Sequence, residues 1–330
     1  MVDDQPIQIS TERSTADRVY RGVGLSAGSM TLLLMAMIGI LLMWRSSDAL
    51  RSRGLSFFTE TRWLPTATGG TFGVAGLLLG TALIAIVALL FAVPIAMGTA
   101  LFITEFAPRR IQRVLTSVID VLAAVPSLIY GIWGATVLQG GEVNVARFLA
   151  THFAWFPPFH VSTQQGAKLT PVDFAASGFL AGIVVALMIL PICTAVMREV
   201  FAQAPPGEKE GALALGGTRW GVIRDVVVPF GKGGIIGGSM LGLGRALGET
   251  IAVASIISPT FAVHDLLQTL KTGGNSIAAL IALRWGEQQN GLTGSALMAA
   301  GLVLFAVTLI VNAAASFVVS RSRSGSATEI

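Results

Sequence analysis

The chain alternates between long apolar stretches and short polar segments. A helix needs about 20 predominantly apolar residues to cross the hydrocarbon core of a membrane. The six stretches that meet this requirement lie near residues 22–44, 74–102, 115–138, 174–197, 233–257 and 295–319. The pattern therefore predicts an all-α, polytopic membrane protein with six transmembrane helices.

The composition excludes several other classes of protein. Hydrophobic residues make up 53% of the chain and charged residues only 12%, whereas a soluble domain carries about a quarter charged residues. This composition excludes a soluble globule and also a disordered chain. The single cysteine, Cys193, excludes an intrachain disulfide and a cysteine cluster, and no metal site is expected.

An even number of spans places both ends of the chain on one side of the membrane. Lys and Arg are more numerous in the segments on the side of the termini than in those on the other side. Because positive charge accumulates inside, this favours cytoplasmic termini. The expected organisation is a cytoplasmic N-terminal segment at 1–21, a transmembrane domain at 22–320 that includes a cytoplasmic loop at 198–232, and a cytoplasmic tail at 321–330.

The loop at 198–232 contains residues that typically begin and end short helices. The segment 208–215 has helical composition and begins with carboxylates, which suit a helix N-terminus. Gly216, followed by a second glycine, can supply a left-handed cap. Thr218 can cap a second helix, which we expect to end at Pro229. The pattern predicts two short helices joined by a tight glycine corner.

The fifth span contains two charged residues. Gly234, Gly238, Gly242, Arg245 and Glu249 follow steps of three or four and would share one helical stripe. A charge in hydrocarbon costs roughly 3 kcal/mol or more, and pairing between Arg245 and Glu249 would reduce this. Such a pair suits either an oxyanion pathway, because the arginine fork matches two oxygens, or a structural lock between helices. The chemistry of these two side chains alone is compatible with both interpretations.

The third span contains a proline followed by two hydroxyl residues. Pro126 frees a backbone carbonyl because it lacks an N–H group. Ser127 and Tyr130 lie directly after it and would be near any pathway that the kink lines. A packing kink with satisfied hydroxyls explains the same residues equally well.

The polar loop resembles a motif of binding-protein-dependent ABC importer permeases, which has the form E-A-A-x-x-x-G-x9-I-x-L-P. Glu210, Ala212, Gly216 and Pro229 match it, and Gly211 departs from its first alanine. Val226 and Val228 replace the aliphatic residues conservatively. The resemblance implies that Glu210, Gly211, Ala212, Gly216 and Pro229 form the part that couples to an ATPase.

The fifth span is similar to the signature of phosphate importer permeases of the PstC type. The residues 245–250 read RALGET after a glycine-rich approach, and the segments 92–95, 102–105 and 124–131 resemble further parts of that family. The sister permease PstA shares much of this pattern. The resemblance implies a type I ABC importer permease fold and a phosphate path that includes Arg245, Glu249 and Thr250, to which Ser127 and Tyr130 are added as candidates.

The resemblance also implies a set of partners. These are a second, PstA-like permease, two PstB-like ATPase subunits, an extracytoplasmic PstS-like phosphate-binding protein and membrane lipid, with no nucleic acid. The chain lacks G-x-x-x-x-G-K-[ST], so it is not expected to be an enzyme or to hold a cofactor, and ATP with Mg would bind the partners. The expected location is the inner membrane of a bacterium.

Two alternatives stay open at this stage. An ABC permease for another oxyanion, such as sulfate or molybdate, would carry the same arginine chemistry. A secondary carrier or channel would work without ATP, although it would have no use for a coupling motif. A membrane-embedded enzyme is the third class considered, and no catalytic cluster in the sequence supports it.

Overall fold

The computed structural model describes residues 15–66, 68–161, 170–259, 267–286 and 291–322. Within these residues, four helices are long and apolar enough to cross a membrane, or up to six if each of two bent pairs is counted as one span. The four are α1 (Thr15–Arg45), α4 (Ala75–Leu101) with the π-helical turn Phe102–Phe106, α8 (Gly178–Ala202) and α15 (Leu292–Ser322).

The expected third span is broken rather than continuous. It consists of α5 (Arg109–Ala124) and α6 (Ser127–Trp133), which continues as the π-helical turn Gly134–Leu138. The two parts are bent by 89° at Pro126. The kink expected at Pro126 in the span at 115–138 is confirmed, and it divides the span because a proline cannot donate the helical hydrogen bond and its ring crowds the preceding turn.

The expected fifth span is also interrupted. Its helix α12 (Lys232–Leu247) ends at Gly248, and a single short turn, α13 (Ile251–Ala254), follows. At its inner end, α12 is bent by 65° relative to the preceding segment Arg219–Phe230. A continuous helix over 233–257 is therefore wrong.

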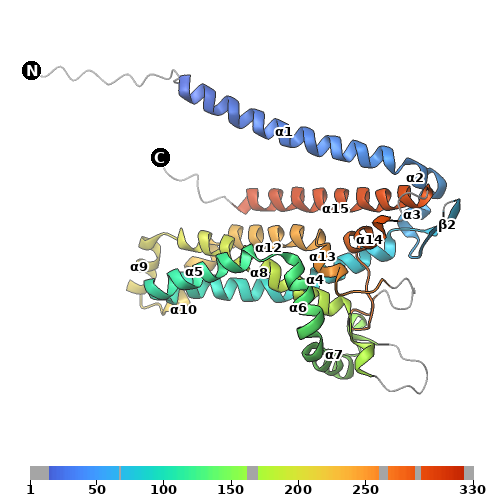
Figure 1. Cartoon of the computed structure of the whole chain (residues 1–330). Coiled ribbons are helices and arrows are strands. Elements are labelled where there is room, and N and C mark those ends of the chain that lie inside the picture. Colours follow the sequence, from blue (N-terminus) through green and yellow to red (C-terminus); the bar gives the residue numbers. More distant parts are fainter. Residues whose placement is uncertain (1–14, 67, 162–169, 260–266, 287–290, 323–330) are drawn as a thin grey trace, which may run out of the picture.

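The long helices form layers around a central pair. α4 and α8 pack along each other, α12 packs on α8, and α15 lies on α12 (Figure 1). The main core runs through this stack and includes Ala88, Ala92 and Ala96 of α4 and Ile189 and Met197 of α8. Small residues on α4 allow the two backbones to approach closely, as is typical of helices packed in membranes.

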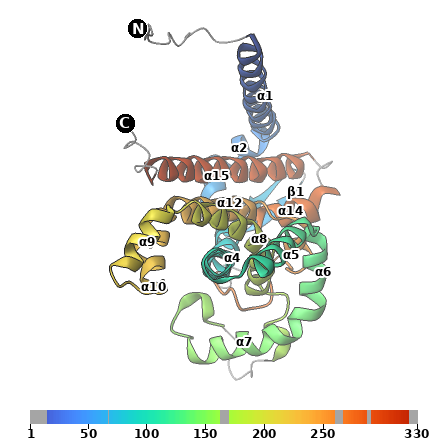
Figure 2. The ribbon, with the colours of Figure 1, turned by 90° about the vertical axis from the view of Figure 1, so that its left-hand side faces the viewer.

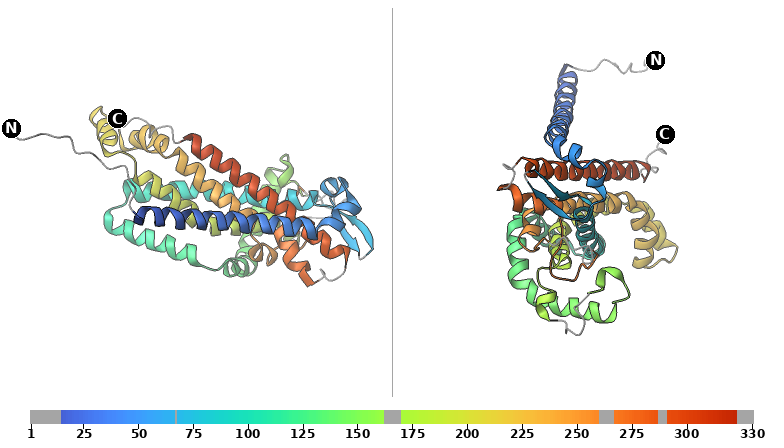
Figure 3. Two further views of the ribbon diagram at one scale, coloured as in Figure 1. Left: turned by 90° about the horizontal axis from the view of Figure 1, so that it is seen from above. Right: turned by 90° about the vertical axis from the view of Figure 1, so that its right-hand side faces the viewer.

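The helix α1 stands apart from this core. None of its residues is buried, and it projects away from the other helices (Figures 2 and 3). The beginning of α1 and the end of α15 lie at the same end of the molecule as α9 (Pro206–Ala214) and α10 (Arg219–Val222) (Figure 1).

The opposite end of the molecule carries a small cap that the sequence did not predict. It consists of α2 (Ser47–Arg53), α3 (Ser56–Thr59) and an antiparallel hairpin of β1 (Trp63–Thr66) and β2 (Gly69–Phe72). The hairpin departs from the all-α expectation. The remaining elements at this end are α7 (Gln139–His152), the 3-10 turns Pro157–Phe159 and Pro171–Asp173, and α14 (Ile277–Arg284).

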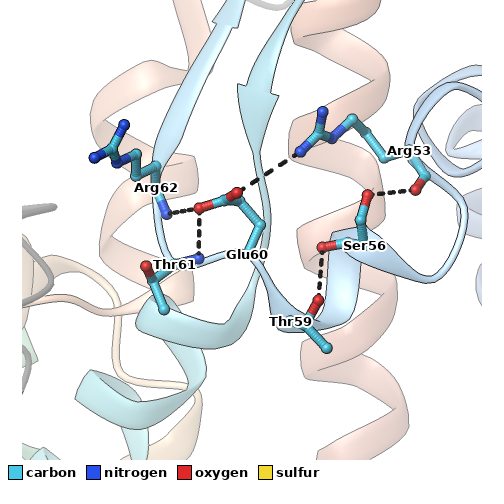
Figure 4. Close-up of polar contacts among 6 residues, drawn as sticks. All are labelled: Arg53, Ser56, Thr59, Glu60, Thr61 and Arg62. Carbon is cyan, nitrogen blue, oxygen red and sulfur yellow. Dashed lines mark hydrogen bonds and ion pairs between the residues drawn. The ribbon is translucent and has the colours of Figure 1, made fainter.

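Glu60 ties the parts of the cap together (Figure 4). Its carboxylate accepts hydrogen bonds from the N–H groups of Arg62 and Thr61 at 3.1 and 3.0 Å, and it lies 3.9 Å from the guanidinium of Arg53. The hydrogen bond from Arg62 lowers the pKa of Glu60 below its ordinary value, and the bond from Thr61 and the charge of Arg53 act in the same direction. The ring of Phe72 lies under the Arg53 guanidinium.

The glycine stripe on α12 packs against α8, which confirms this part of the sequence prediction. A Cβ atom on Gly242 would lie 2.6 Å from the sulfur of Cys193, and one on Gly234 would lie 2.6 Å from Val200. Gly238 is buried between these two positions. Only glycine allows this close approach of the two helices.

A methyl group at Gly242 should therefore destabilise the bundle. Gly242→Ala overpacks the contact with Cys193, which we expect to cost about 1–3 kcal/mol, and it should lower the melting temperature of the purified chain in detergent. Gly237→Ala is the matched control, because its new Cβ would lie 3.6 Å from Val319, an ordinary contact. Equal melting temperatures for the two variants would contradict the packing argument.

Candidate functional site

The kink in the third span is held by a side-chain hydrogen bond. In a regular helix the N–H of residue 126 would donate to the carbonyl of Leu122, but Pro126 has no N–H. The hydroxyl of Tyr130 donates to this carbonyl instead, at 3.0 Å, and the N–H of Val125 adds a longer bond of 3.3 Å. Tyr130 thus supports the bend, while Ser127 lies half-buried at the start of α6.

The break in the fifth span is organised by Glu249. This side chain is only 8% exposed, and its Oε1 atom accepts the N–H of Ala252 at 3.2 Å. It therefore caps the short turn α13, whose first N–H groups lack helical partners. The hydroxyl of Thr250 donates to the carbonyl of Gly248 at 3.0 Å. Both polar side chains thus satisfy backbone groups where α12 has ended.

The expected ion pair between Arg245 and Glu249 does not form. Because α12 ends at Leu247, a step of four residues no longer places the second side chain one turn above the first. The ion pairs seen within the described ranges include Arg53–Glu60, Lys209–Glu105 and Arg224–Asp225, and none of these involves Arg245 or Glu249.

Arg245 is consequently left without a counter-charge from its own helix. It lies in the last turn of α12 with an exposed side chain. No hydrogen bond joins it to Glu249, Thr250, Ser127 or Tyr130 in the part of the chain that the structure describes. A guanidinium in this position presents five N–H donors in a planar fork.

The two breaks lie on elements that pack against each other. α6, which carries Ser127 and Tyr130, contacts α13, which Glu249 caps. The approach is close, because a Cβ atom on Gly131 would lie 2.7 Å from the Cα atom of Ala252. The structure thus brings four of the five candidate path residues onto adjoining elements, and the fifth, Arg245, precedes one of these breaks.

The glycine corner of the loop at 198–232 forms as predicted. Gly216 has a φ of +85°, and its N–H donates to the carbonyl of Leu213 at 3.0 Å, while the N–H of Gly217 donates to Ala212 at 3.0 Å. These two bonds make a Schellman cap for α9. The hydroxyl of Thr218 accepts the N–H of Gly221 at 3.2 Å, which confirms the second cap.

The second helix of the loop does not end at Pro229. It continues from α10 through the π-helical turn Ile223–Val227 into α11 (Val228–Phe230) and bends only at Gly231. A π-helical turn widens the helix, and this relieves the clash that Pro229 would otherwise cause. Pro229 therefore lies at the far end of this helix from the glycine corner.

The corner exposes apolar side chains that the sequence analysis did not single out. Glu210 and Gly211 are exposed, and Ala212 packs partly against the main core. Leu215 is 92% exposed and Trp220 is 67% exposed. The available signal was a large apolar residue on each side of a glycine pair in a polar loop.

No metal or cofactor site emerges from the described residues. Nowhere among them do three His, Cys, Asp or Glu side chains gather at a spacing that would hold a metal ion. An open groove does run along α5, lined by Arg113, Val114, Ser117, Val118, Val121 and Leu122.

Comparisons of the sequence with a family model and with known proteins agree on one family. Residues 92–324 match the model of the binding-protein-dependent transport system inner membrane component. The chain is 42% identical over 302 residues to the phosphate transport system permease protein PstC 2 of Mycobacterium bovis, covering 91% of this chain and 90% of the relative. It is 37% identical to the phosphate transport system permease protein PstC of Xylella fastidiosa, covering 90% and 88%.

Solved structures share the fold at low sequence identity. A bacterial alginate ABC transporter, solved with an alginate-bound periplasmic protein, matches with a TM-score of 0.54 at 16% identity, covering 95% of this chain and all of that one. The MetNI methionine ABC transporter matches with a TM-score of 0.52 at 12% identity, covering 76% and 95%. With a family match over most of its length and relatives near 40% identity, the chain belongs to the inner membrane components of binding-protein-dependent ABC transport systems.

Proposed function

We propose that this chain is the PstC-type permease subunit of an ATP-driven importer that moves inorganic phosphate into a bacterial cell across the inner membrane. The observation that carries the proposal is Arg245, a cation on a membrane helix with no ion-pair partner among the described residues. The relatives named as phosphate permeases support phosphate as the anion.

Arg245 gives a passing anion temporary charge compensation. Its fork can engage two phosphate oxygens at once. Glu249 caps α13 and forms no ion pair with the guanidinium. A carboxylate four residues along the chain favours release of the anion, and conduction requires a site that releases its cargo. Thr250, Ser127 and Tyr130 lie on the adjoining elements and help to shape this part of the path.

The glycine corner of the loop is the site where ATP-driven movement enters the permease. α9, with Glu210, Gly211 and Ala212, ends in the rigid cap at Gly216, and its exposed apolar neighbours offer a surface to an ATPase subunit. The chain itself is a translocation subunit. ATP with Mg binds two PstB-like partners, which hydrolyse it.

The remaining partners follow from the geometry of a single subunit. One chain has an exposed groove on α5 and an α1 helix without buried residues, so a second, PstA-like permease completes the path and lipid covers the outer helices. A PstS-like phosphate-binding protein docks at the end with the β-hairpin. The beginning of α1 and the end of α15 lie at the end of the molecule that carries α9, which supports a cytoplasmic location for both termini.

Another oxyanion such as sulfate or molybdate is the second candidate substrate, since a guanidinium fork fits any of them. The anion bound by the partner binding protein separates these cases: phosphate supports the proposal and sulfate or molybdate contradicts it. A secondary carrier or channel would move the anion in vesicles that contain no nucleotide, whereas the proposed importer would not.

Replacing Arg245 should abolish phosphate uptake. Arg245→Gln removes the charge, and because a hydrogen bond to a charged group contributes about 1.5–3 kcal/mol, we expect uptake to fall about tenfold or more. Arg245→Lys keeps the charge without the fork and should retain intermediate activity. The measurement is uptake of radiolabelled phosphate at equal membrane levels of the chain. Normal uptake by Arg245→Gln would remove this residue from the mechanism.

Replacing Gly216 should uncouple the ATPase from transport. Gly216→Val forces a β-branched residue to positive φ, which costs of order 1–3 kcal/mol, and it should abolish stimulation of ATP hydrolysis by the loaded binding protein. Gly211→Ala is the matched control, because nothing lies within 4 Å of its new Cβ and the helix gains about 1 kcal/mol of propensity. An intact ATPase response in Gly216→Val would argue against the coupling role.

Removing the Glu249 cap should damage both stability and transport. In Glu249→Ala the N–H of Ala252 loses its acceptor, and an unpaired buried donor costs about 1–3 kcal/mol. We expect a lower melting temperature and reduced phosphate uptake. A variant that melts like the unmodified chain would show that the carboxylate does not hold the break.

A further inference from the structure

One ion pair connects the cytoplasmic loop to a span that is distant in sequence. The Nζ atom of Lys209, on α9, donates to the Oε1 atom of Glu105 at 2.7 Å. Glu105 lies in the π-helical turn Phe102–Phe106 that closes the inner end of α4. The two residues are 104 positions apart in the chain, so the bond joins two elements that nothing in the local sequence holds together.

This ion pair differs from its neighbour in the same loop. The side chains of Lys209 and Glu105 are 23% and 14% exposed, and short, charge-assisted bonds of this kind are stronger than neutral ones. Arg224 and Asp225 are adjacent in sequence, 3.9 Å apart, and 78% and 73% exposed. An exposed pair between sequence neighbours contributes little and connects no separate elements.

The position of the pair allows it to transmit movement from α9 to α4. α9 follows α8 directly, through the short connection 203–205, so any movement of α9 reaches α8 through the backbone. α4 has no such covalent link to α9. Yet α4 and α8 are the central packed pair of the bundle, so a movement of α8 that keeps this packing intact requires α4 to move with it. The bond from Lys209 to Glu105 supplies the missing connection to α4.

We propose that Lys209 and Glu105 are positioning residues that fasten α9 to the inner end of α4, so that movement imposed on α9 by the ATPase reaches α4 as well as α8. This inference rests on the proposed function. Neither residue touches the transported anion. Their role is to keep ATP hydrolysis and transport coupled.

The test uses the complete importer, with both permeases, the ATPases and the binding protein, reconstituted in lipid vesicles. ATP hydrolysis and phosphate uptake are measured together, and the readout is the number of ATP molecules hydrolysed per phosphate imported. Lys209→Glu and Glu105→Lys should each raise this ratio several-fold. The double charge swap should restore it, and Lys209→Arg should leave it unchanged.

Arg224→Glu is the matched control, since it makes the same change of charge at the exposed pair of the same loop and should leave the ratio unchanged. A merely stabilising role for the half-buried pair would lower the melting temperature of the single variants without changing the ratio. That result, or a double swap that fails to restore coupling, would overturn the inference. Absence of ATP-dependent phosphate uptake in the unmodified importer would instead contradict the proposed function itself.

Discussion

The structure depends on one constraint, which is that every backbone polar group inside a membrane needs a partner. Two spans are broken, at Pro126 and after Leu247, and each break frees backbone groups from their helical partners. Tyr130 satisfies the carbonyl freed at the first break, and Glu249 satisfies an N–H group freed at the second. Arg245, just before the second break, has no ion-pair partner among the described residues.

The two breaks are also matched in depth. α5 and α12 both begin with basic residues, at Arg109 and Lys232, and both are 16 residues long. At 1.5 Å per residue each inner segment rises about 24 Å, which is less than the hydrocarbon thickness of about 30 Å. Each of the two segments is therefore too short to cross the hydrocarbon by itself, and the elements that follow them, α6 and α13, pack against each other. At its other end, α12 is connected to the loop that carries the glycine corner.

The sequence predicted those features that local chemistry decides. The Gly216 cap, the Thr218 cap and the packing of Gly242 follow from glycine and hydroxyl residues at diagnostic spacings. The end of α12 at Gly248 could not be foreseen, because this helix tolerates glycines throughout its length. The predicted ion pair between Arg245 and Glu249 assumed that the helix continued, and it was wrong for the same reason. The contact from Lys209 to Glu105 depends on the tertiary fold, since no local pattern links residues so far apart.

The central claim is that Arg245 faces a water-filled path in the working importer. Its most direct test is the reactivity of Arg245→Cys in a Cys193→Ala background, which removes the single native cysteine. A charged, water-soluble thiol reagent should modify residue 245 in the assembled importer. Arg224→Cys, at a side chain that is 78% exposed and belongs to none of the proposed docking surfaces, serves as the positive control. If the control reacts and residue 245 does not, with reagent supplied on both sides of the membrane, Arg245 does not face the path and the account is wrong.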